Sequence, residues 1–514
     1  MSTALPHSDD VDVKSDSASS GAASPEAALA VPAWNGKRTW FRTTFFNMSV
    51  LGLCCFLAPG LWGATASLGA GGSQSPQLVN TGNAVLFSLM TVTAQLTPAL
   101  VHLTSIKTAL VIGGLGYSPY AAALYVKSRE LPGADAFIIA GAAMCGLSAG
   151  IFWSAEGAIA LAYPEPANRG RYLSYWLSFR VLGQLIGGVI NLSLNADRAS
   201  AGSISVNTYL VFVILQALAP AAALLLSKPG KVQRSDGSPV YLHIATGWRT
   251  EIANMARLLK RKEVLLILPF MWQGTFSESL IGTYAATHFT VRSRALGSFL
   301  SAVVASLGVI TLGLLLDFKK LSINARAKTS FFAVVGMQLG WWIFATVVMN
   351  RYHKSGVVLD WEDAGWSTGF AVYILLQLGF NLQYELMYGI IQGGFEDQAE
   401  IVRLASMLRS VESAGQAVSY GINATGLRLD AVAGINFALF GLSAPLVYFF
   451  VRNIGIAADG TKLFEAPIHA PPEQRAILAA KGVPGVVGHD AQGHAVIAGT
   501  NVNPEDVEEP LAKQ

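Results

Sequence analysis

Charged residues are scarce in this chain of 514 residues. Only 13% of the residues are Asp, Glu, Lys or Arg, whereas 52% are hydrophobic; an ordinary soluble domain has roughly 25% charged residues. The net charge is a mild +3, and no basic cluster interleaved with aromatic residues supplies the electrostatic footprint of nucleic-acid binding. The composition therefore argues against a water-soluble protein, and we expect no nucleic-acid partner.

Residues that bind metals or nucleotides in recognisable motifs are also missing. The three cysteines, Cys54, Cys55 and Cys145, lie inside apolar runs and offer neither a disulfide framework nor paired zinc-ligand spacing. The eight histidines include no H-x-x-x-H pair, and the sequence contains no P-loop and no hydrolase nucleophile elbow. We therefore expect no metal, no cofactor and no enzymatic activity, and no transport driven directly by ATP.

Both ends of the chain lack long hydrophobic runs. Residues 1–36 are rich in Ser, Ala, Asp and Pro, without the apolar core of a signal peptide, and are predicted to form a disordered cytoplasmic tail. Residues 454–514 mix Gly, Pro, His and Glu without sustained periodicity and are predicted to be a second cytoplasmic tail.

Long apolar runs dominate the sequence between the tails. Covering the roughly 30 Å of a bilayer core takes about 20 residues of helix, and twelve runs are long enough. They predict an all-α membrane protein with a first six-helix half at 37–227, a basic central loop at 228–262 and a second six-helix half at 263–453. The predicted spans are 43–64, 79–101, 106–126, 135–158, 172–194, 207–227, 264–286, 296–316, 329–350, 367–391, 402–424 and 432–452.

The connections predict the direction of these spans. If the N-terminus is cytoplasmic, twenty Lys and Arg residues fall in inside connections and eight in outside connections. Basic residues accumulate on the cytoplasmic side, so both termini are predicted to be cytoplasmic. Whether the membrane is the plasma membrane or an endomembrane stays open.

A repeat links the two halves. The stretch "GQLIGGVIN" (183–191) returns 232 residues later as "GQAVSYGIN" (415–423), and ten of 35 aligned positions around it are identical. The offset pairs span five with span eleven, as in the two parallel halves of the major facilitator superfamily, whose substrate site lies between them. Small and amide residues of this repeat are predicted to pack helices together: Gly183, Gln184, Gly187, Gly188, Gly415 and Gln416.

A loop before span nine carries a partial superfamily signature. The stretch "GLLLDFKK" (313–320) resembles the superfamily loop G-x-x-x-D-x-[RK]-[RK], and the resemblance implies a gating role for Asp317, Lys319 and Lys320. The corresponding first-half loop, "QLTPALVHLTSIK", has no acidic residue. The alternative is that Asp317 is a solvated loop charge.

Several stretches are similar to the Unc-ninety-three-like branch of this superfamily, and particularly to its fungal members. They include "LAPGLWGATASLGAGG", "GLSAGIFWSAEGAIALAYPEPANRGRYLSYW", "KVQRSDGSPV", "RSRALGSFLSAV" and "SMLRSVESAGQAVSYGIN", within about residues 43–453. The resemblance implies a twelve-helix facilitator fold. It also implies two kinds of activity, because the branch includes proposed transporters and members thought to regulate ion channels or to escort other membrane proteins.

Three charged residues are predicted to lie near the middle of the membrane, where charges are costly and point to function. Arg180 follows Arg171 by nine residues, roughly 14 Å along a helix, and its counterpart at offset 232 is Glu412, one turn after Arg409. They are candidates for a charge network that is remade between access states. The alternatives are local pairs, Arg409 with Glu412 or Arg180 with Glu156.

A polar face on span ten predicts that this helix lines a cavity, because polar side chains avoid lipid. Spans four and seven carry similar residues, and the superfamily resemblance places spans one, four, seven and ten around the central cavity. The candidate cavity residues are Gln377, Asn381, Tyr384, Glu385 and Tyr388 on span ten, Trp272, Gln273 and Glu278 on span seven, and Trp153 and Glu156 on span four. The carboxyl groups among them could carry a proton or bind a cation.

The sequence therefore predicts a secondary transporter that moves a small solute across the bilayer by alternating access, with proton coupling as one option. The alternative is a non-transporting regulator or trafficking escort of another membrane protein. The solute is not identified by the sequence.

Overall fold

The computed structural model describes most of the chain between residues 39 and 463. The described residues are 39–73, 75–165, 169–235, 237, 240, 248–316, 318, 320–395, 398–456, 460, 462–463, 487–489 and 495–497. The predicted N-terminal tail, Asp317 and Lys319 lie outside this set. Lys320 is described and is exposed.

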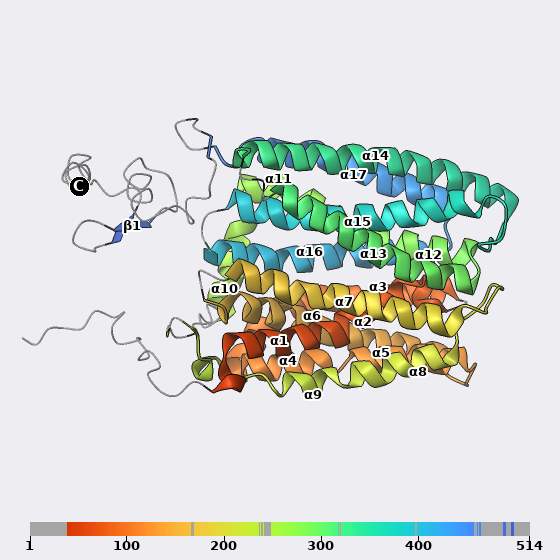
Figure 1. Ribbon diagram of the computed structural model, residues 1–514, viewed down its shortest axis with the longest axis horizontal. Helices are drawn as coiled ribbons and strands as arrows, with labels where there is room; N and C mark the ends of the chain where they lie inside the picture. The colour runs from red at the N-terminus through yellow and green to blue at the C-terminus, as the bar shows by residue number, and fades with distance from the viewer. Residues whose placement is uncertain are drawn as a thin grey trace, which may run out of the picture.

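The chain folds into a bundle of long helices that run roughly side by side (Figure 1). The first half contains η2 (Trp40–Arg42), α1 (Thr44–Cys55), η3 (Phe56–Gly60), α2 (Leu61–Ser67), η4 (Ala70–Gly72), α3 (Pro76–Leu103), α4 (Ile106–Gly114), α5 (Tyr117–Ser128), α6 (Ala134–Ala162), α7 (Arg169–Asn195), α8 (Val206–Ala217) and α9 (Ala219–Ala223). The remainder contains η6 (Pro229–Lys231), α10 (Trp248–Leu259), α11 (Lys262–Gln273), α12 (Ser277–His288), α13 (Val291–Leu316), α14 (Ile323–Ser355), α15 (Trp366–Gly394), α16 (Gln398–Ala424), α17 (Leu429–Val451), β1 (Val487–His489) and β2 (Ala495–Ile497).

Ten helical segments in the described part of the chain are long and apolar enough to cross a membrane. Helices α15 and α16 have 29 and 27 residues and run alongside those segments in Figure 1, so the bundle agrees with the twelve predicted spans. Large apolar side chains point out of the bundle, among them Leu314 (69% exposed) and Leu442 (71% exposed). A helix that is apolar on its outer side as well as its inner side is suited to lipid.

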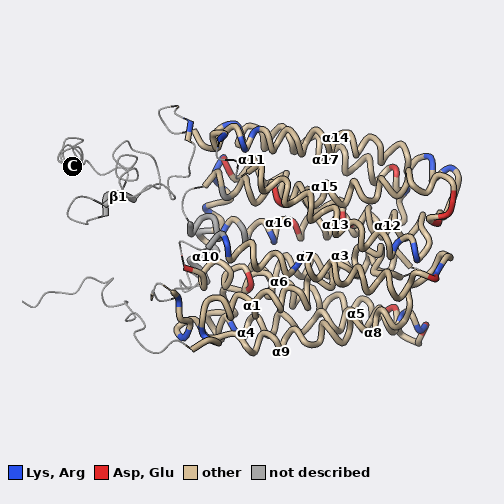
Figure 2. Tube along the Cα trace, in the orientation of Figure 1, with Lys and Arg blue, Asp and Glu red and all other residues tan. Residues whose placement is uncertain are grey.

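Each six-helix half has its own core. One cluster of buried residues runs from Met48 to Val240 and reaches Val291, Ala295 and Tyr420 of the second half. The other cluster lies within Val264 to Ile454. The charged residues gather at the two ends of the bundle, and a few lie in its middle near α16 (Figure 2). We call the end that carries Thr39 and Ile454 the terminal end, and the opposite end the distal end.

Spans one and seven are both interrupted halfway. Span one passes from α1 through the π-helical turn η3, which contains Pro59, into α2. Span seven breaks between α11, which contains Pro269, and α12. Proline removes a backbone donor and disturbs the helical ladder. The two breaks occupy corresponding positions in the two halves.

The structure differs from the sequence prediction in four places. The central loop contains the helix α10, and α14 begins at Ile323, six residues before the predicted start. Helix α13 begins at Val291 rather than 296, so Arg292 and Arg294, which we assigned to an outside loop, are helical. The C-terminal tail contains the antiparallel pair β1 and β2, where the sequence analysis assigned no fold.

Candidate functional site

A pair of opposite charges lies in the middle of α16. Arg409 Nη1 is 3.2 Å from Glu412 Oε2, and the two side chains are 14% and 2% exposed. This is the local i, i+3 pair that the sequence analysis gave as an alternative. Removing two charges from water is costly, and their mutual attraction offsets part of that cost.

Two guanidinium groups pack against the ring of Tyr384 on α15. The Arg409 Cζ atom lies 4.7 Å from the ring centroid, and the Arg180 Cζ atom of α7 lies 5.4 Å from it. Arg409 also lies 4.1 Å from the ring centroid of Trp153 on α6. Two of these cation–π contacts cross between the halves, Arg180 with Tyr384 and Arg409 with Trp153, whereas Arg409 and Tyr384 both belong to the second half.

Arg180 does not form the local pair with Glu156 that we considered. No ion pair within 4.0 Å and no side-chain hydrogen bond engages Arg180 among the described residues, and its Nε atom is buried without a partner. Glu156 instead accepts a hydrogen bond from Trp176 Nε1 at 2.8 Å. Its Oε2 atom is buried and has no hydrogen-bond partner within that part of the chain.

Glu278 lies on the first turn of α12, directly after the break in span seven. Gln416 of α16 donates a hydrogen bond to Glu278 Oε2 at 2.5 Å. Gln416 belongs to the repeat, so this repeat residue contacts a candidate cavity carboxyl group rather than only packing two helices.

Polar side chains on α15 make several of their contacts within their own helix. Tyr384 and Tyr388 approach each other with 3.3 Å between their hydroxyl oxygens, and Asn381 donates to the Gln377 carbonyl oxygen of its own helix at 2.9 Å. Glu385 and Tyr388 are half-buried on this face. The half-buried Trp272 of span seven packs its ring against Phe276, with 5.1 Å between the centroids.

Gln273 takes part in a buried amide network within the second half. Gln383 Nε2 donates to Gln273 Oε1 at 2.6 Å, and Gln338 Nε2 donates to Gln383 Oε1 at 3.2 Å. Sequence analysis missed Gln383 because it lies off the polar stripe of span ten. A buried glutamine in an apolar run is a signal that could have found it.

The repeat residues bind the interrupted helix of their own half. A Cβ atom at Gly183 would lie 2.8 Å from the Phe56 carbonyl oxygen of span one, and one at Gly415 would lie 2.0 Å from the Trp272 carbonyl oxygen of span seven. Asn191 donates to the Ala64 carbonyl oxygen at 3.0 Å. These contacts brace both breaks.

Other repeat residues also make close contacts. A Cβ atom at Gly187 would approach Ala64 Cβ to 2.4 Å, and the Gln184 side chain packs against Gly63. Gly188 faces the other half, because a Cβ atom there would lie 2.7 Å from Phe299 Cα of α13.

The distal end is closed between the halves by Arg294 of α13, which is 3% exposed. Its Nε atom donates to the Leu68 carbonyl oxygen at 2.7 Å, and its Nη2 and Nη1 atoms donate to the carbonyl oxygens of Gly69 and Gly202, each at 2.9 Å. A planar guanidinium fork can serve several acceptors at once. Sequence analysis missed this residue because it placed the start of span eight too late.

Two of the acceptors for Arg294, the carbonyl oxygens of Leu68 and Gly69, lie at an unusual turn after span one. Gly69, Ala70, Gly71 and Gly72 have φ angles of 78°, 46°, 59° and 76°. Side chains rarely tolerate this left-handed region, whereas glycine does. The three glycines therefore allow the chain to turn at the distal end, where its carbonyl groups meet Arg294.

The terminal end of the first half is fastened by the start of the central loop. Glu165 Oε1 accepts hydrogen bonds from Ser235 N at 2.7 Å, Ser235 Oγ at 2.8 Å and Thr44 Oγ1 at 3.1 Å. Burial alone would raise the pKa of Glu165, but these hydrogen bonds lower it below its usual value. Arg234 donates to the Tyr163 and Ala162 carbonyl oxygens at 3.1 Å and 2.5 Å.

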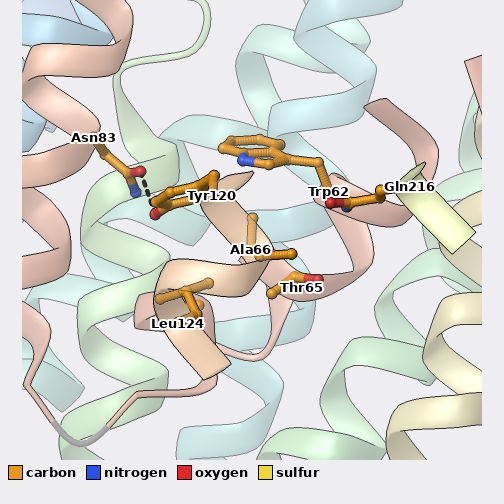
Figure 3. Close-up of a pocket in the computed structure, with 9 residues that line it drawn as sticks. Trp62, Thr65, Ala66, Asn83, Tyr120, Leu124 and Gln216 are labelled. Atoms are coloured by element: carbon orange, nitrogen blue, oxygen red, sulfur yellow. Dashed lines mark hydrogen bonds between the residues drawn. The ribbon is translucent and has the colours of Figure 1, made fainter. Parts of the chain in front are cut away.

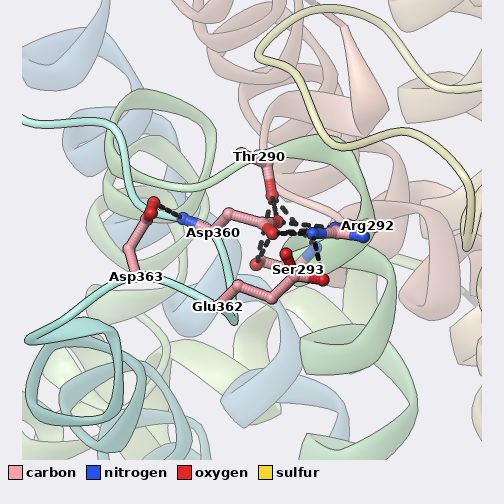
Figure 4. A network of polar contacts seen from close by, with 6 residues as sticks. All are labelled: Thr290, Arg292, Ser293, Asp360, Glu362 and Asp363. Atoms are coloured by element: carbon pink, nitrogen blue, oxygen red, sulfur yellow. Dashed lines mark hydrogen bonds and ion pairs between the residues drawn. The ribbon is translucent and has the colours of Figure 1, made fainter.

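A second polar network lies at the distal end of the second half (Figure 4). Asp360 forms an ion pair with Arg292 and accepts a hydrogen bond from Thr290 Oγ1 at 2.5 Å. The hydrogen bonds from Arg292 lower the pKa of Asp360 to about 2. This network joins the loop between α14 and α15 to the start of α13.

A small cavity with a mixed apolar and polar lining lies within the first half (Figure 3). Asn83 Oδ1 accepts a hydrogen bond from Tyr120 at 2.7 Å beside it, and the buried Gln216 Oε1 has no hydrogen-bond partner in the described residues. Trp62 and Thr65 complete its polar and aromatic lining. All of its lining residues belong to the first half, so it is separate from the charges shared between the halves. Within the part of the chain that the structure describes, no group of three His, Cys, Asp or Glu side chains could hold a metal.

The fold is that of the major facilitator superfamily. The chain is similar to a D-xylose–proton symporter, with a TM-score of 0.56 and 12% identity over 81% of this chain and 100% of that one. It is also similar to the inward-open xylose transporter XylE from E. coli (TM-score 0.53, 14% identity, 79% of this chain and 96% of that one) and to FucP, a Major Facilitator Superfamily transporter, in the outward conformation (0.51, 14%, 79% and 99%).

Sequence relatives identify the branch. A family model described as "Ion channel regulatory protein UNC-93" matches residues 79–349. The chain is 41% identical over 430 residues to the notoamide biosynthesis cluster protein O' of Aspergillus versicolor, covering 83% of this chain and 92% of that protein. It is 28% identical over 426 residues to UNC93-like protein 1 of Arabidopsis thaliana, covering 80% and 92%. The chain belongs to the UNC-93 family, which confirms the resemblance found in the sequence.

Proposed function

We propose that this protein is a secondary transporter that moves a small solute across a membrane by alternating access. The observation that carries the proposal is the contact of Arg180 and Arg409 with the same ring, Tyr384, because it joins charges of both halves inside the bundle. A rocking motion of the halves would break or remake this contact, which a passive membrane protein has no need for.

The interrupted helices support the same proposal. Breaks in corresponding helices of the two halves mark binding sites in transporters built from repeats. Glu278 follows one break directly, and Gly183 and Gly415 brace the two breaks. The solved relatives with this fold include transporters, and their substrates remain properties of those proteins.

Carboxyl groups in the site suit proton coupling. Glu412 pairs with Arg409, and Glu156 and Glu278 lie on α6 and α12, which both pack against α16. Burying an unpaired charge is expensive. A proton taken up on one side and released on the other would keep the charge of the site balanced as the halves move, and Glu385 is a further candidate carrier.

Flux into liposomes tests the proposal. Purified protein is reconstituted and offered labelled sugars, amino acids, organic acids and cations, with and without a pH gradient. We expect gradient-dependent flux of at least one solute in the wild type, and its loss in Glu278→Gln and Glu385→Gln. Glu263→Gln is the matched control, because that side chain is 48% exposed at the start of span seven.

A regulator or escort of another membrane protein is the second candidate, and the name of the family, ion channel regulatory protein UNC-93, favours it. It predicts no flux above protein-free liposomes for any member of the panel, together with copurification of one stoichiometric membrane partner. It also predicts that Glu385→Gln keeps that partner. Flux without a partner would contradict it.

A further inference from the structure

We propose that the solute carries an anionic group, such as a carboxylate, that binds to Arg180. This inference rests on the proposed transport function and names the chemical class of its substrate. The starting point is an imbalance: Arg180 is half-buried, its Nε atom is closed off from solvent, and its side chain makes no hydrogen bond or ion pair with the described residues. A buried donor atom without an acceptor is costly.

The carboxyl groups around Arg180 are already engaged elsewhere. Glu412 pairs with Arg409, Glu278 accepts from Gln416, and Glu156 accepts from Trp176. None of the three lies within ion-pair distance of Arg180. The guanidinium therefore keeps donors available for a ligand from outside the chain.

The two arginines beside Tyr384 make the proposed ligand site positively charged. Both guanidinium groups lie within 5.4 Å of one ring centroid, and like charges repel each other in a poorly solvated interior. An anion beside them would reduce that repulsion. Guanidinium binds carboxylate through two parallel hydrogen bonds, and charge-assisted bonds of this kind are the stronger ones.

The surroundings favour an organic anion over an inorganic one. Trp153, which stacks on Arg409, and Tyr388, whose hydroxyl approaches that of Tyr384, provide half-buried aromatic surface next to the charges. Ligand sites combine apolar walls with a few placed polar groups. A small carboxylate with an apolar or aromatic body meets both requirements.

The test compares anions with uncharged molecules of the same shape. Thermal unfolding of the purified full-length protein is measured with benzoate and indole-3-acetate, and with benzamide and indole-3-acetamide. We expect the carboxylates to raise Tm in a saturable way and to bind at least about tenfold more tightly than the amides, since a hydrogen bond to a charged group is worth about 1.5–3 kcal/mol.

Variants assign the effect to Arg180. Arg180→Gln should abolish the preference for carboxylates, and Arg180→Lys should retain part of it. Arg171→Gln, an exposed arginine on the same helix, should behave as the wild type. If Arg180→Gln does not fold, the preference is compared between Arg180→Lys and the wild type.

Three results would overturn the inference: equal binding of amides and carboxylates, an unchanged preference in a folded Arg180→Gln protein, or no shift with any of the four probes in folded wild type. Failure of the inference and failure of transport are distinguishable. Carboxylate binding without flux in liposomes would retain the anion site and contradict transport. Flux of an uncharged solute that Arg180→Gln leaves unchanged would retain transport and contradict the anion site.

Discussion

At the scale of single residues, Asp360 and Arg180 show two ways in which the fold accommodates a charge. Asp360 at the distal end is paired with Arg292. Arg180 in the middle stacks on Tyr384. Charges at the ends of the bundle stay partly hydrated, so forming an ion pair there costs little desolvation free energy. In the interior the desolvation cost is large, and each charged side chain requires a specific partner.

The Asp360 network predicts a pH-dependent stability. Arg292 lowers the pKa of Asp360 from 3.8 to about 2, so folding favours the ionised carboxylate. The stabilisation is present in full above the usual pKa and is lost as the pH falls toward about 2. We expect Asp360→Asn to lower Tm at neutral pH, at a cost on the order of 1–2 kcal/mol.

Scanning fluorimetry from about pH 7 to about pH 3 measures this effect. The Tm difference between wild type and Asp360→Asn should shrink below about pH 4. Glu362→Gln, whose side chain is 73% exposed, is the matched control and should change Tm little. A difference that stays constant across the pH range would show that the charge of Asp360 is not what stabilises the loop.

At the scale of elements, corresponding helices of the two halves use the same residues for the same contacts. Span five braces the interrupted span one through Gly183 and Asn191, and span eleven braces the interrupted span seven through Gly415 and Asn423, which donates to Ser279 at 2.8 Å. The repeat in the sequence is therefore a repeat of helix contacts. Asn191 and the neighbouring Gly188 also contact the opposite half, at Ser298 and Phe299 of α13.

The contacts between α13 and the first half predict that substitutions on either side of them open the distal end. Arg294→Gln removes donors to the turn after span one, and Gly188→Ala places a Cβ atom 2.7 Å from Phe299 Cα. Both changes weaken contacts between halves and none within a half. We expect each to increase the population in which the distal ends are apart.

Spin labels at Ala201→Cys and Ala364→Cys, two exposed distal positions in opposite halves, report that separation, because the native cysteines are buried. Arg294→Gln and Gly188→Ala should shift the distance distribution to longer values. Gly183→Ala is the control, since it crowds Gly60 within the first half and should lower Tm without changing the separation. An unchanged distribution in Arg294→Gln would contradict a closing role for this residue.

At the scale of the whole molecule, the bundle has two ends of different character. The terminal end carries the start of α1, the end of α17 and the central loop, which is fastened to the first half through Glu165 and Arg234. The distal end carries some of the contacts that join the halves, including backbone hydrogen bonds from Val291 to Ser200 and from Arg292 to Arg198, each at 3.0 Å. These hydrogen bonds restrain motion between the halves at the distal end.

The excess of Lys and Arg in the connections at the terminal end predicts that this end faces the cytoplasm. Epitope tags on the N- and C-termini should both be protected from protease in intact cells and digested after permeabilisation. A tag in a loop at the distal end, between α7 and α8, should show the opposite behaviour where the protein reaches the cell surface. Digestion of a terminal tag before permeabilisation would contradict this orientation.

The sequence alone determined which segments cross the membrane and how they repeat. Covering the bilayer core requires an unbroken apolar length with satisfied backbone hydrogen bonds, and this requirement is local, so it can be read from composition. The local pair of Arg409 and Glu412 was also predictable, because residues three apart on a helix are neighbours. The family resemblance followed from the same stretches.

The tertiary structure decided which residues meet across the bundle. Arg180 contacts Tyr384 rather than Glu156, Gln383 bonds Gln273, and Arg294 reaches the turn after span one. These partners are 110 to 226 residues apart or belong to different halves. Helix rotation and tilt set such contacts, and the apolar pattern leaves both free, because a membrane helix is apolar on nearly all sides.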